Sequence, residues 1–123
     1  MENKFKILVV DDSSVMRKGI IEILNTHIQA DFIEARDGND ALEQYKAEQP
    51  DLVTLDINMP VCDGMTTLGN IMAFDRNAKI IMLTTEAEKD KIIKAVEMGA
   101  KSYIVKPINK DKAIEKIKNV LEL

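Results

Sequence analysis

The chain has 123 residues, of which 46% are apolar and 31% are charged, as is typical of one soluble globular domain. Its formal net charge of −4 argues against broad nucleic-acid binding, because phosphate contacts need clustered Lys and Arg. A single cysteine excludes an intramolecular disulfide, and no apolar run approaches the ~20 residues of a membrane-spanning helix. We therefore expect one cytoplasmic domain over residues 1–123 with no membrane insertion.

Apolar residues alternate along the chain between two patterns. Short β-branched runs such as Ile7–Val10 are typical of buried strands, and apolar residues that recur every three or four positions are typical of helices. Gly99 is expected to end the fourth helix, and Gly69 weakens the third by about 1 kcal/mol relative to Ala. The predicted elements are, in chain order, a strand at 7–10, a helix at 15–24, a strand at about 31–35, a helix from 41 to before Pro50, a strand at 52–55, a helix at 65–72, a strand at 80–83, a helix at 92–99, a strand at 103–105 and a helix at 113–121.

Five predicted strands thus alternate with five predicted helices. This alternation indicates an α/β fold in which helices cover both faces of a parallel sheet and the crossovers are right-handed. Five units are too few for the eight-stranded barrel, so an open, doubly wound five-stranded sheet is favoured. The pattern alone leaves the order of the strands open.

Polar side chains follow four of the predicted strands directly. Asp11 and Asp12 follow the first strand, Asp56 the third, Thr84 the fourth and Lys106 the fifth. Because the carboxyl ends of parallel strands share one edge of an open sheet, where ligands bind, we expect these five side chains to lie together.

This group has the chemistry of a phosphoryl-transfer site. Three neighbouring carboxylates repel one another unless a cation intervenes, and ligand sets made only of oxygen favour Mg²⁺. Lys106 and Thr84 can contact an anionic phosphoryl group, and Asp56 is the central candidate for a carboxylate nucleophile. Each residue alone has an ordinary alternative, as a helix cap, a packed hydroxyl or a solvated lysine. The joint pattern favours function, whereas Cys62 and His27 are assigned to packing or to the surface.

At these residues the sequence resembles the receiver domain of bacterial two-component response regulators, the CheY-like family. The resemblance covers essentially the whole chain, and the segments that carry it are Ile7–Arg17, Asp51–Gly64, Ile80–Ala87 and Gly99–Pro107. It implies a flavodoxin-like sheet with strand order 2-1-3-4-5. The closest likeness is to stand-alone regulators of the chemotaxis type.

The resemblance also implies roles for individual residues. Asp56 is expected to accept the phosphoryl group, with Mg²⁺ held by Asp11, Asp12, Asp56 itself and the backbone carbonyl of Asn58. Lys106 is expected to contact the phosphate and report its presence.

Further implied roles concern switching and the lifetime of the phosphoryl group. Thr84 supplies the switch hydroxyl and Tyr103 the switch aromatic. Asn58 and Glu86 flank the path of the attacking water and suggest relatively fast turnover. Pro107 resembles a cis-linked proline, although the sequence does not establish the isomer. The departures from the family pattern are Thr85 in place of a small residue, Cys62 in place of Met, and Gly69 inside a helix.

The implied function is a single-domain switch of a phosphorelay, with chemotaxis as a candidate pathway. A sensor histidine kinase phosphorylates Asp56, and a surface at about 87–123, made by the fourth helix, fifth strand and fifth helix, changes its affinity for an output protein. That output protein is a flagellar motor switch or another effector, and a phosphatase is a further candidate partner. We expect a monomer, because this surface carries many charges. We also expect the chain not to be an enzyme, apart from the chemistry of its own phosphorylation and dephosphorylation.

Other assignments fit part of this pattern. The chain is alternatively the N-terminal receiver of a longer DNA-binding regulator, or an interaction module that works without phosphorylation. A dehalogenase-type phosphatase needs a second Asp at position 58, which is Asn58 here. A flavodoxin-type electron carrier is disfavoured because Asp11 and Asp12 would repel the flavin phosphate.

Overall fold

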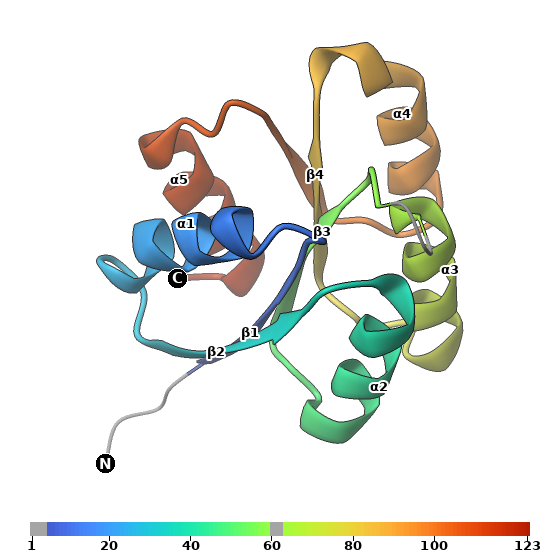
Figure 1. Ribbon diagram of the computed structural model, residues 1–123, viewed down its shortest axis with the longest axis horizontal. Coiled ribbons are helices and arrows are strands. Elements are labelled where there is room, and N and C mark those ends of the chain that lie inside the picture. Colours follow the sequence, from blue (N-terminus) through green and yellow to red (C-terminus); the bar gives the residue numbers. More distant parts are fainter. Residues whose placement is uncertain (1–4, 60–62) are drawn as a thin grey trace.

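The computed structural model describes residues 5–59 and 63–123, which form one five-stranded parallel sheet covered by helices on both faces (Figure 1). The strands pair in the order β2-β1-β3-β4-β5, so the predicted α/β class and the strand order implied by the resemblance are both confirmed. The elements are β1 (Phe5–Val10), α1 (Ser14–Asn25), β2 (Ala30–Ala35), α2 (Gly38–Glu48), β3 (Leu52–Asp56), α3 (Gly64–Phe74), β4 (Ile80–Thr84), the 3₁₀ turn η1 (Glu86–Glu88), α4 (Lys89–Glu97), β5 (Ser102–Val105) and α5 (Lys110–Leu121).

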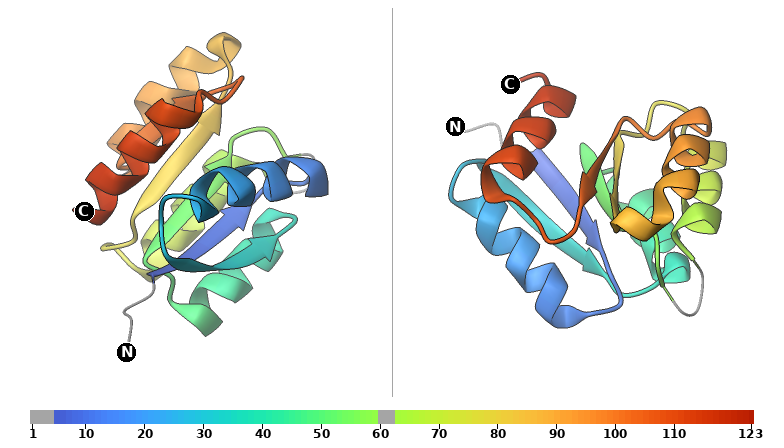
Figure 2. Two further views of the ribbon diagram at one scale, coloured as in Figure 1. Left: turned by 90° about the vertical axis from the view of Figure 1, so that its left-hand side faces the viewer. Right: turned by 90° about the horizontal axis from the view of Figure 1, so that it is seen from above.

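The sheet separates two apolar cores. Helices α1 and α5 lie against one face, and α2, α3 and α4 lie against the other, as the view from above also shows (Figures 1 and 2). Successive side chains of a strand point to opposite faces. In β1, Ile7 and Val9 accordingly pack with α1 and α5, and Leu8 and Val10 with the other three helices. Strands buried on both faces read as unbroken apolar runs, which is why these segments were recognisable in the sequence.

Side-chain caps set where four helices begin. Ser13, Asp37, Asp63 and Asn109 each accept a hydrogen bond from a backbone N–H three residues later, at 2.8–3.2 Å. Such caps satisfy N–H groups that have no partner within the helix. Two of these caps, Ser13 and Asp63, lie between a central strand and the helix that follows it, on the side of the sheet where the predicted site lies.

Backbone conformation explains one glycine and close packing explains another. Gly99 follows α4 with a φ of +116°, the left-handed conformation expected of a residue that ends a helix. Gly69, unusual inside a helix, lies where an added Cβ would sit 3.4 Å from the Met98 methyl, so it allows Met98, which follows α4, to pack closely on α3.

The region after β4 differs from the sequence prediction. A helix was expected from residue 92, but α4 begins at Lys89 and is preceded by η1. Thr85 and Glu88 form a capping box at the start of η1, in which Glu88 Oε1 accepts hydrogen bonds from the Thr85 backbone N–H at 3.3 Å and hydroxyl at 3.2 Å, and α4 continues directly from this turn. A polar contact of this kind has no apolar periodicity and was therefore missed.

Other expectations concern single positions. The Lys106–Pro107 peptide bond is cis, an isomer that the sequence left open. Cys62 lies outside the described residues. Within the described residues, no helix is both long and apolar enough to cross a membrane.

Candidate functional site

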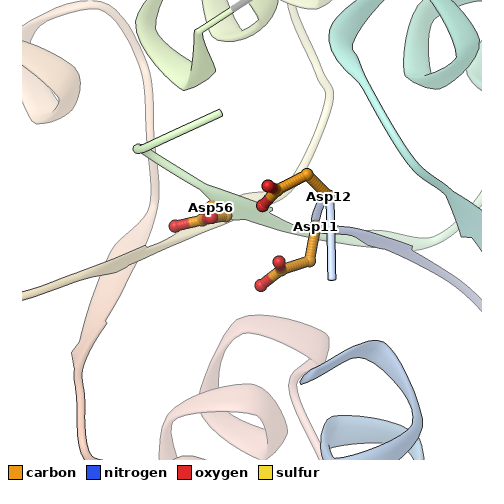
Figure 3. Close-up of side chains that lie close together, drawn as sticks. All are labelled: Asp11, Asp12 and Asp56. Carbon is orange, nitrogen blue, oxygen red and sulfur yellow. The ribbon is translucent and has the colours of Figure 1, made fainter. Parts of the chain in front are cut away.

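Three carboxylates meet at the carboxyl edge of the sheet, as predicted (Figure 3). Asp11 and Asp12 directly follow β1, and Asp56 is the last residue of β3, the strand beside β1. One carboxylate oxygen from each lies within 4.8 Å of the other two. Asp11 and Asp56 are buried, whereas Asp12 is exposed, so the cluster opens to solvent on the Asp12 side.

Asp11 combines a satisfied oxygen with an orphaned one. Its Oδ1 accepts a hydrogen bond from the Ser13 N–H at 3.0 Å. Its buried Oδ2 has no hydrogen-bond partner among the described residues and lies 3.8 Å from the Lys106 ammonium. Burial raises the pKa of Asp11, and the nearby Asp56 charge adds to this effect against the lowering by the Ser13 hydrogen bond.

Asp56 is held by one ammonium and one backbone amide. Its Oδ1 accepts hydrogen bonds from Lys106 Nζ at 3.2 Å and from the Asn58 N–H at 3.3 Å. Its side chain is only 5% exposed, and burial raises its pKa even though Lys106 lowers it.

Gly64 allows this geometry at Asp56. A Cβ at Gly64 would lie 2.3 Å from the Asp56 carbonyl oxygen, and the Gly64 N–H donates to the Ile57 carbonyl at 2.9 Å. No side chain fits at such a distance, so the start of α3 rests directly on the backbone of the site. A glycine is required at this position by contact and not by an unusual φ.

Lys106 follows the edge strand β5 and reaches back over the cluster. Its Nζ contacts Asp56 at 3.2 Å and Asp11 at 3.8 Å, and its own N–H donates to the Thr84 carbonyl at 2.7 Å. Three carboxylates with one ammonium leave a formal charge of −2. Together with the orphaned Asp11 oxygen and a donor set made only of oxygen, this charge fits a divalent hard cation such as Mg²⁺.

Arg17 supports the acidic pair and was missed as a site residue from the sequence. Its Nη1 donates to the Asp11 carbonyl at 2.6 Å, and its Nε donates to Glu34 at 2.8 Å. The guanidinium therefore ties the loop after β1 to β2. The sequence signal that could have identified it is the position of this arginine, one turn into the helix that follows the acidic pair.

The predicted switch residues Thr84 and Tyr103 line the same surface hollow, but the hydrogen bond of the Thr84 hydroxyl goes to a backbone carbonyl and not to one of the three carboxylates. Thr84 is buried at the end of β4, and its hydroxyl donates to the Thr85 carbonyl at 3.2 Å. Tyr103 in β5 is 39% exposed and points to the surface. Glu86 is exposed and pairs with Lys89 at 3.4 Å, so its role in phosphoryl lifetime stays a prediction, as does that of the exposed Asn58.

Comparison with family models matches residues 7–118 to the response regulator receiver domain. The chain belongs to this family. The receiver is 43% identical over 120 residues to the chemotaxis protein CheY of Treponema pallidum, covering 96% of this chain and 83% of the relative. It is 42% identical over 116 residues to the chemotaxis protein CheY of Bacillus subtilis, covering 94% of this chain and 97% of that protein.

A solved structure supports the same assignment. A chain of the crystal structure of the CheX–CheY–BeF₃–Mg²⁺ complex from Borrelia burgdorferi matches the receiver with a TM-score of 0.88 and 38% identity. The match covers 94% of this chain and 88% of that chain. The resemblance inferred from the strand-end residues is thus confirmed, and the receiver belongs to a chemotaxis-type branch of two-component response regulators.

Proposed function

We propose that Asp56 accepts a phosphoryl group from the phosphohistidine of a sensor kinase. The observation that carries this proposal is the Asp56 carboxylate, which is buried at the sheet edge with the Lys106 ammonium at 3.2 Å and two further carboxylates within 4.8 Å. A carboxylate oxygen attacks phosphorus, the bond from phosphorus to the histidine nitrogen breaks, and that nitrogen keeps the electron pair. The product is a mixed anhydride between Asp56 and phosphate.

The surrounding residues stabilise charge during this transfer. Lys106 is placed to contact an oxygen of the arriving phosphoryl group, and this is the main contribution a protein makes to such reactions. Asp11, Asp12, Asp56 and the Asn58 carbonyl would hold Mg²⁺. When bound, Mg²⁺ supplies positive charge to the phosphoryl oxygens. Hydrolysis later returns the carboxylate, so the chain acts as a switch and not as an enzyme with an external substrate.

The switch itself requires Thr84 to exchange partners. In this structure the Thr84 hydroxyl donates to the Thr85 carbonyl. A phosphoryl group on Asp56 offers strong acceptor oxygens at the end of the neighbouring strand, and the hydroxyl moves toward it. Tyr103 then turns into space released beside Thr84. Such a local electrostatic event shifts the populations of two conformations of the surface.

The responding surface is made by α4, β5 and α5. It exposes Ile93 (64%), Val96 (50%) and Tyr103 (39%), which is more apolar area than the sequence had suggested. Exposed apolar side chains of this kind favour a protein partner that covers them after phosphorylation. The monomeric state and cytoplasmic location of the free protein stay predictions.

The named relatives indicate the pathway and partners. Because the relatives are chemotaxis proteins, we assign the chain to chemotaxis, with a flagellar motor switch or another effector as its output partner. The neighbour solved together with CheX makes a CheX-like protein a second candidate partner, one that would act on the phosphorylated form as a phosphatase.

Intact-mass spectrometry with Mg²⁺ and acetyl phosphate tests the proposal. We expect one added phosphoryl group that is lost with hydroxylamine, and no addition to Asp56→Asn or in the presence of EDTA. Glu43→Gln, which removes an exposed carboxylate on α2, is the matched control and should be phosphorylated like the wild type.

Two results would overturn the proposal. Equal phosphorylation of Asp56→Asn would place the acceptor elsewhere. No phosphorylation by acetyl phosphate or by a purified chemotaxis kinase, together with no Mg²⁺ binding, would favour an interaction module that works without phosphorylation.

A further inference from the structure

Lys116 on α5 makes two different contacts with Tyr103 on β5. Its ammonium lies 4.2 Å from the centre of the tyrosine ring, and it also donates a hydrogen bond to the Tyr103 backbone carbonyl. A cation over an aromatic face is attracted by the negative potential of the ring. One lysine therefore contacts both the strand and the ring of the residue expected to switch.

Tyr103 stands between two hollows on the surface. The α4-side hollow, of about 420 Å³, is lined by Thr84, Thr85, Ile92 and Ile93 as well as Tyr103. The α5-side hollow, of about 450 Å³, is lined by Tyr103 with Lys106, Lys112 and Lys116. Of these two hollows, Thr84 lines the one on the α4 side and Lys116 the one on the α5 side. A rotation of the Tyr103 side chain toward Thr84 thus takes the ring away from Lys116.

The two contacts of Lys116 respond differently to such a rotation. The hydrogen bond to the carbonyl involves only the backbone of β5, so a rotation of the ring does not itself break it. The contact with the ring exists only while the ring lies on the α5 side. The carbonyl thereby holds the ammonium in place, and the ammonium favours one of the two ring positions.

We propose that Lys116 is a positioning residue that holds the Tyr103 ring on the α5 side in the unphosphorylated protein. The inference rests on the proposed function, in which the ring turns toward Thr84 after Asp56 is phosphorylated. Cation–π contacts at exposed sites correspond to about a two- to fivefold change in an equilibrium. Loss of the Lys116 charge should therefore raise the ratio of inward to outward ring positions about two- to fivefold before any phosphorylation.

Fluorine NMR of protein labelled with 3-fluorotyrosine can measure the ring position directly. The chain has two tyrosines, so the spectrum should contain two resonances, and Tyr45→Phe assigns them. Tyr45 is buried and donates to Asp75 at 2.7 Å, far from α5 in the fold, and provides an internal reference. Beryllofluoride with Mg²⁺, a stable mimic of the phosphoryl group, defines the position of the Tyr103 resonance in the switched state.

Four variants separate the ring contact from general charge effects. Lys116→Met and Lys116→Gln both remove the charge, and we expect both to move the resting Tyr103 resonance toward its switched position. Lys116→Arg keeps a cation over the ring and should restore the wild-type position. Lys112→Met removes the same charge from the same hollow and helix and should leave the resonance unchanged.

The results distinguish this inference from the proposed function. If wild-type Tyr103 responds to beryllofluoride but neither Lys116→Met nor Lys116→Gln changes the resting resonance, the positioning role is wrong and the switch stands. An equal shift in Lys112→Met would also overturn the positioning role. If wild-type Tyr103 does not respond to beryllofluoride, the switch role of Tyr103 itself fails.

Discussion

Removal of the Asp56 charge should stabilise the protein in the absence of Mg²⁺. At an effective dielectric constant of about 20, Lys106 at 3.2 Å favours the Asp56 charge by about 5 kcal/mol. Asp11 and Asp12, within 4.8 Å, oppose it by about 3.5 kcal/mol each. Solvent screens the exposed Asp12, but burial of Asp56 acts in the same direction as the repulsion. We therefore expect Asp56→Asn to raise the free energy of unfolding by about 1–2 kcal/mol.

This gain is large enough to measure by thermal unfolding. An entropy of unfolding of about 2.1 cal/mol/K per residue converts 1–2 kcal/mol into a rise in Tm of about 4–8 °C for a chain of 123 residues. Mg²⁺ at ten times its Kd should raise the wild-type Tm by about 5 °C, because binding to the folded state adds about 1.4 kcal/mol. Asp56→Asn should gain less from Mg²⁺, so the two melting temperatures converge as Mg²⁺ is added.

The pH dependence provides a second test of the same reasoning. Because folding raises the pKa of Asp56 above its ordinary value of 3.8, the contribution of Asp56 to stability is greatest below that value and is lost as pH rises through the folded-state pKa. The advantage of Asp56→Asn should thus be present at pH 7 and absent below about pH 3.8.

Circular dichroism melts with and without EDTA, with Glu43→Gln as the control for loss of one surface charge, measure both effects. A Tm for Asp56→Asn below that of the wild type at pH 7 without Mg²⁺ would refute the reasoning. It would mean that the ion pair with Lys106 outweighs the repulsion and the cost of burial.

Three further substitutions test the packing around the site. The Thr54 hydroxyl is buried without a hydrogen-bond partner among the described residues. Thr54→Val should therefore raise the free energy of unfolding by about 1 kcal/mol and the Tm by about 4 °C. A Tm below that of the wild type would indicate that the hydroxyl binds a water molecule. Gly64→Ala should cost about 1–3 kcal/mol and slow phosphorylation of Asp56 by acetyl phosphate, because its Cβ would meet the Asp56 carbonyl; unchanged rates in mass spectrometry would contradict this contact. Asp63→Ala should cost about 1 kcal/mol at pH 7 through the lost cap. Since the hydrogen bond from the Thr66 N–H lowers the pKa of Asp63, this cost should shrink as pH falls below 3.8, and a cost that does not change with pH in urea titrations would argue against the cap.

Local patterns in the sequence determined the elements and the edge of the sheet that carries chemistry. β-branched runs, helical periodicity and capping residues such as Ser13 act over a few positions, so they can be recognised without knowing the tertiary contacts. Parallel strands place their carboxyl ends at one edge, and this rule alone predicted that Asp11, Asp56 and Lys106 would meet. Their meeting within 4 Å, through Lys106, confirms it.

Only the tertiary structure decided contacts that depend on the packing of distant elements. The guanidinium of Arg17 on α1 reaches Glu34 on β2, 17 positions away in the chain, because α1 packs beside that strand. Tyr103 lies under the ammonium of Lys116 because α5 packs beside β5. Contacts of this kind depend on the direction of each side chain and on which elements lie side by side. The spacing of residues along one segment specifies neither of these.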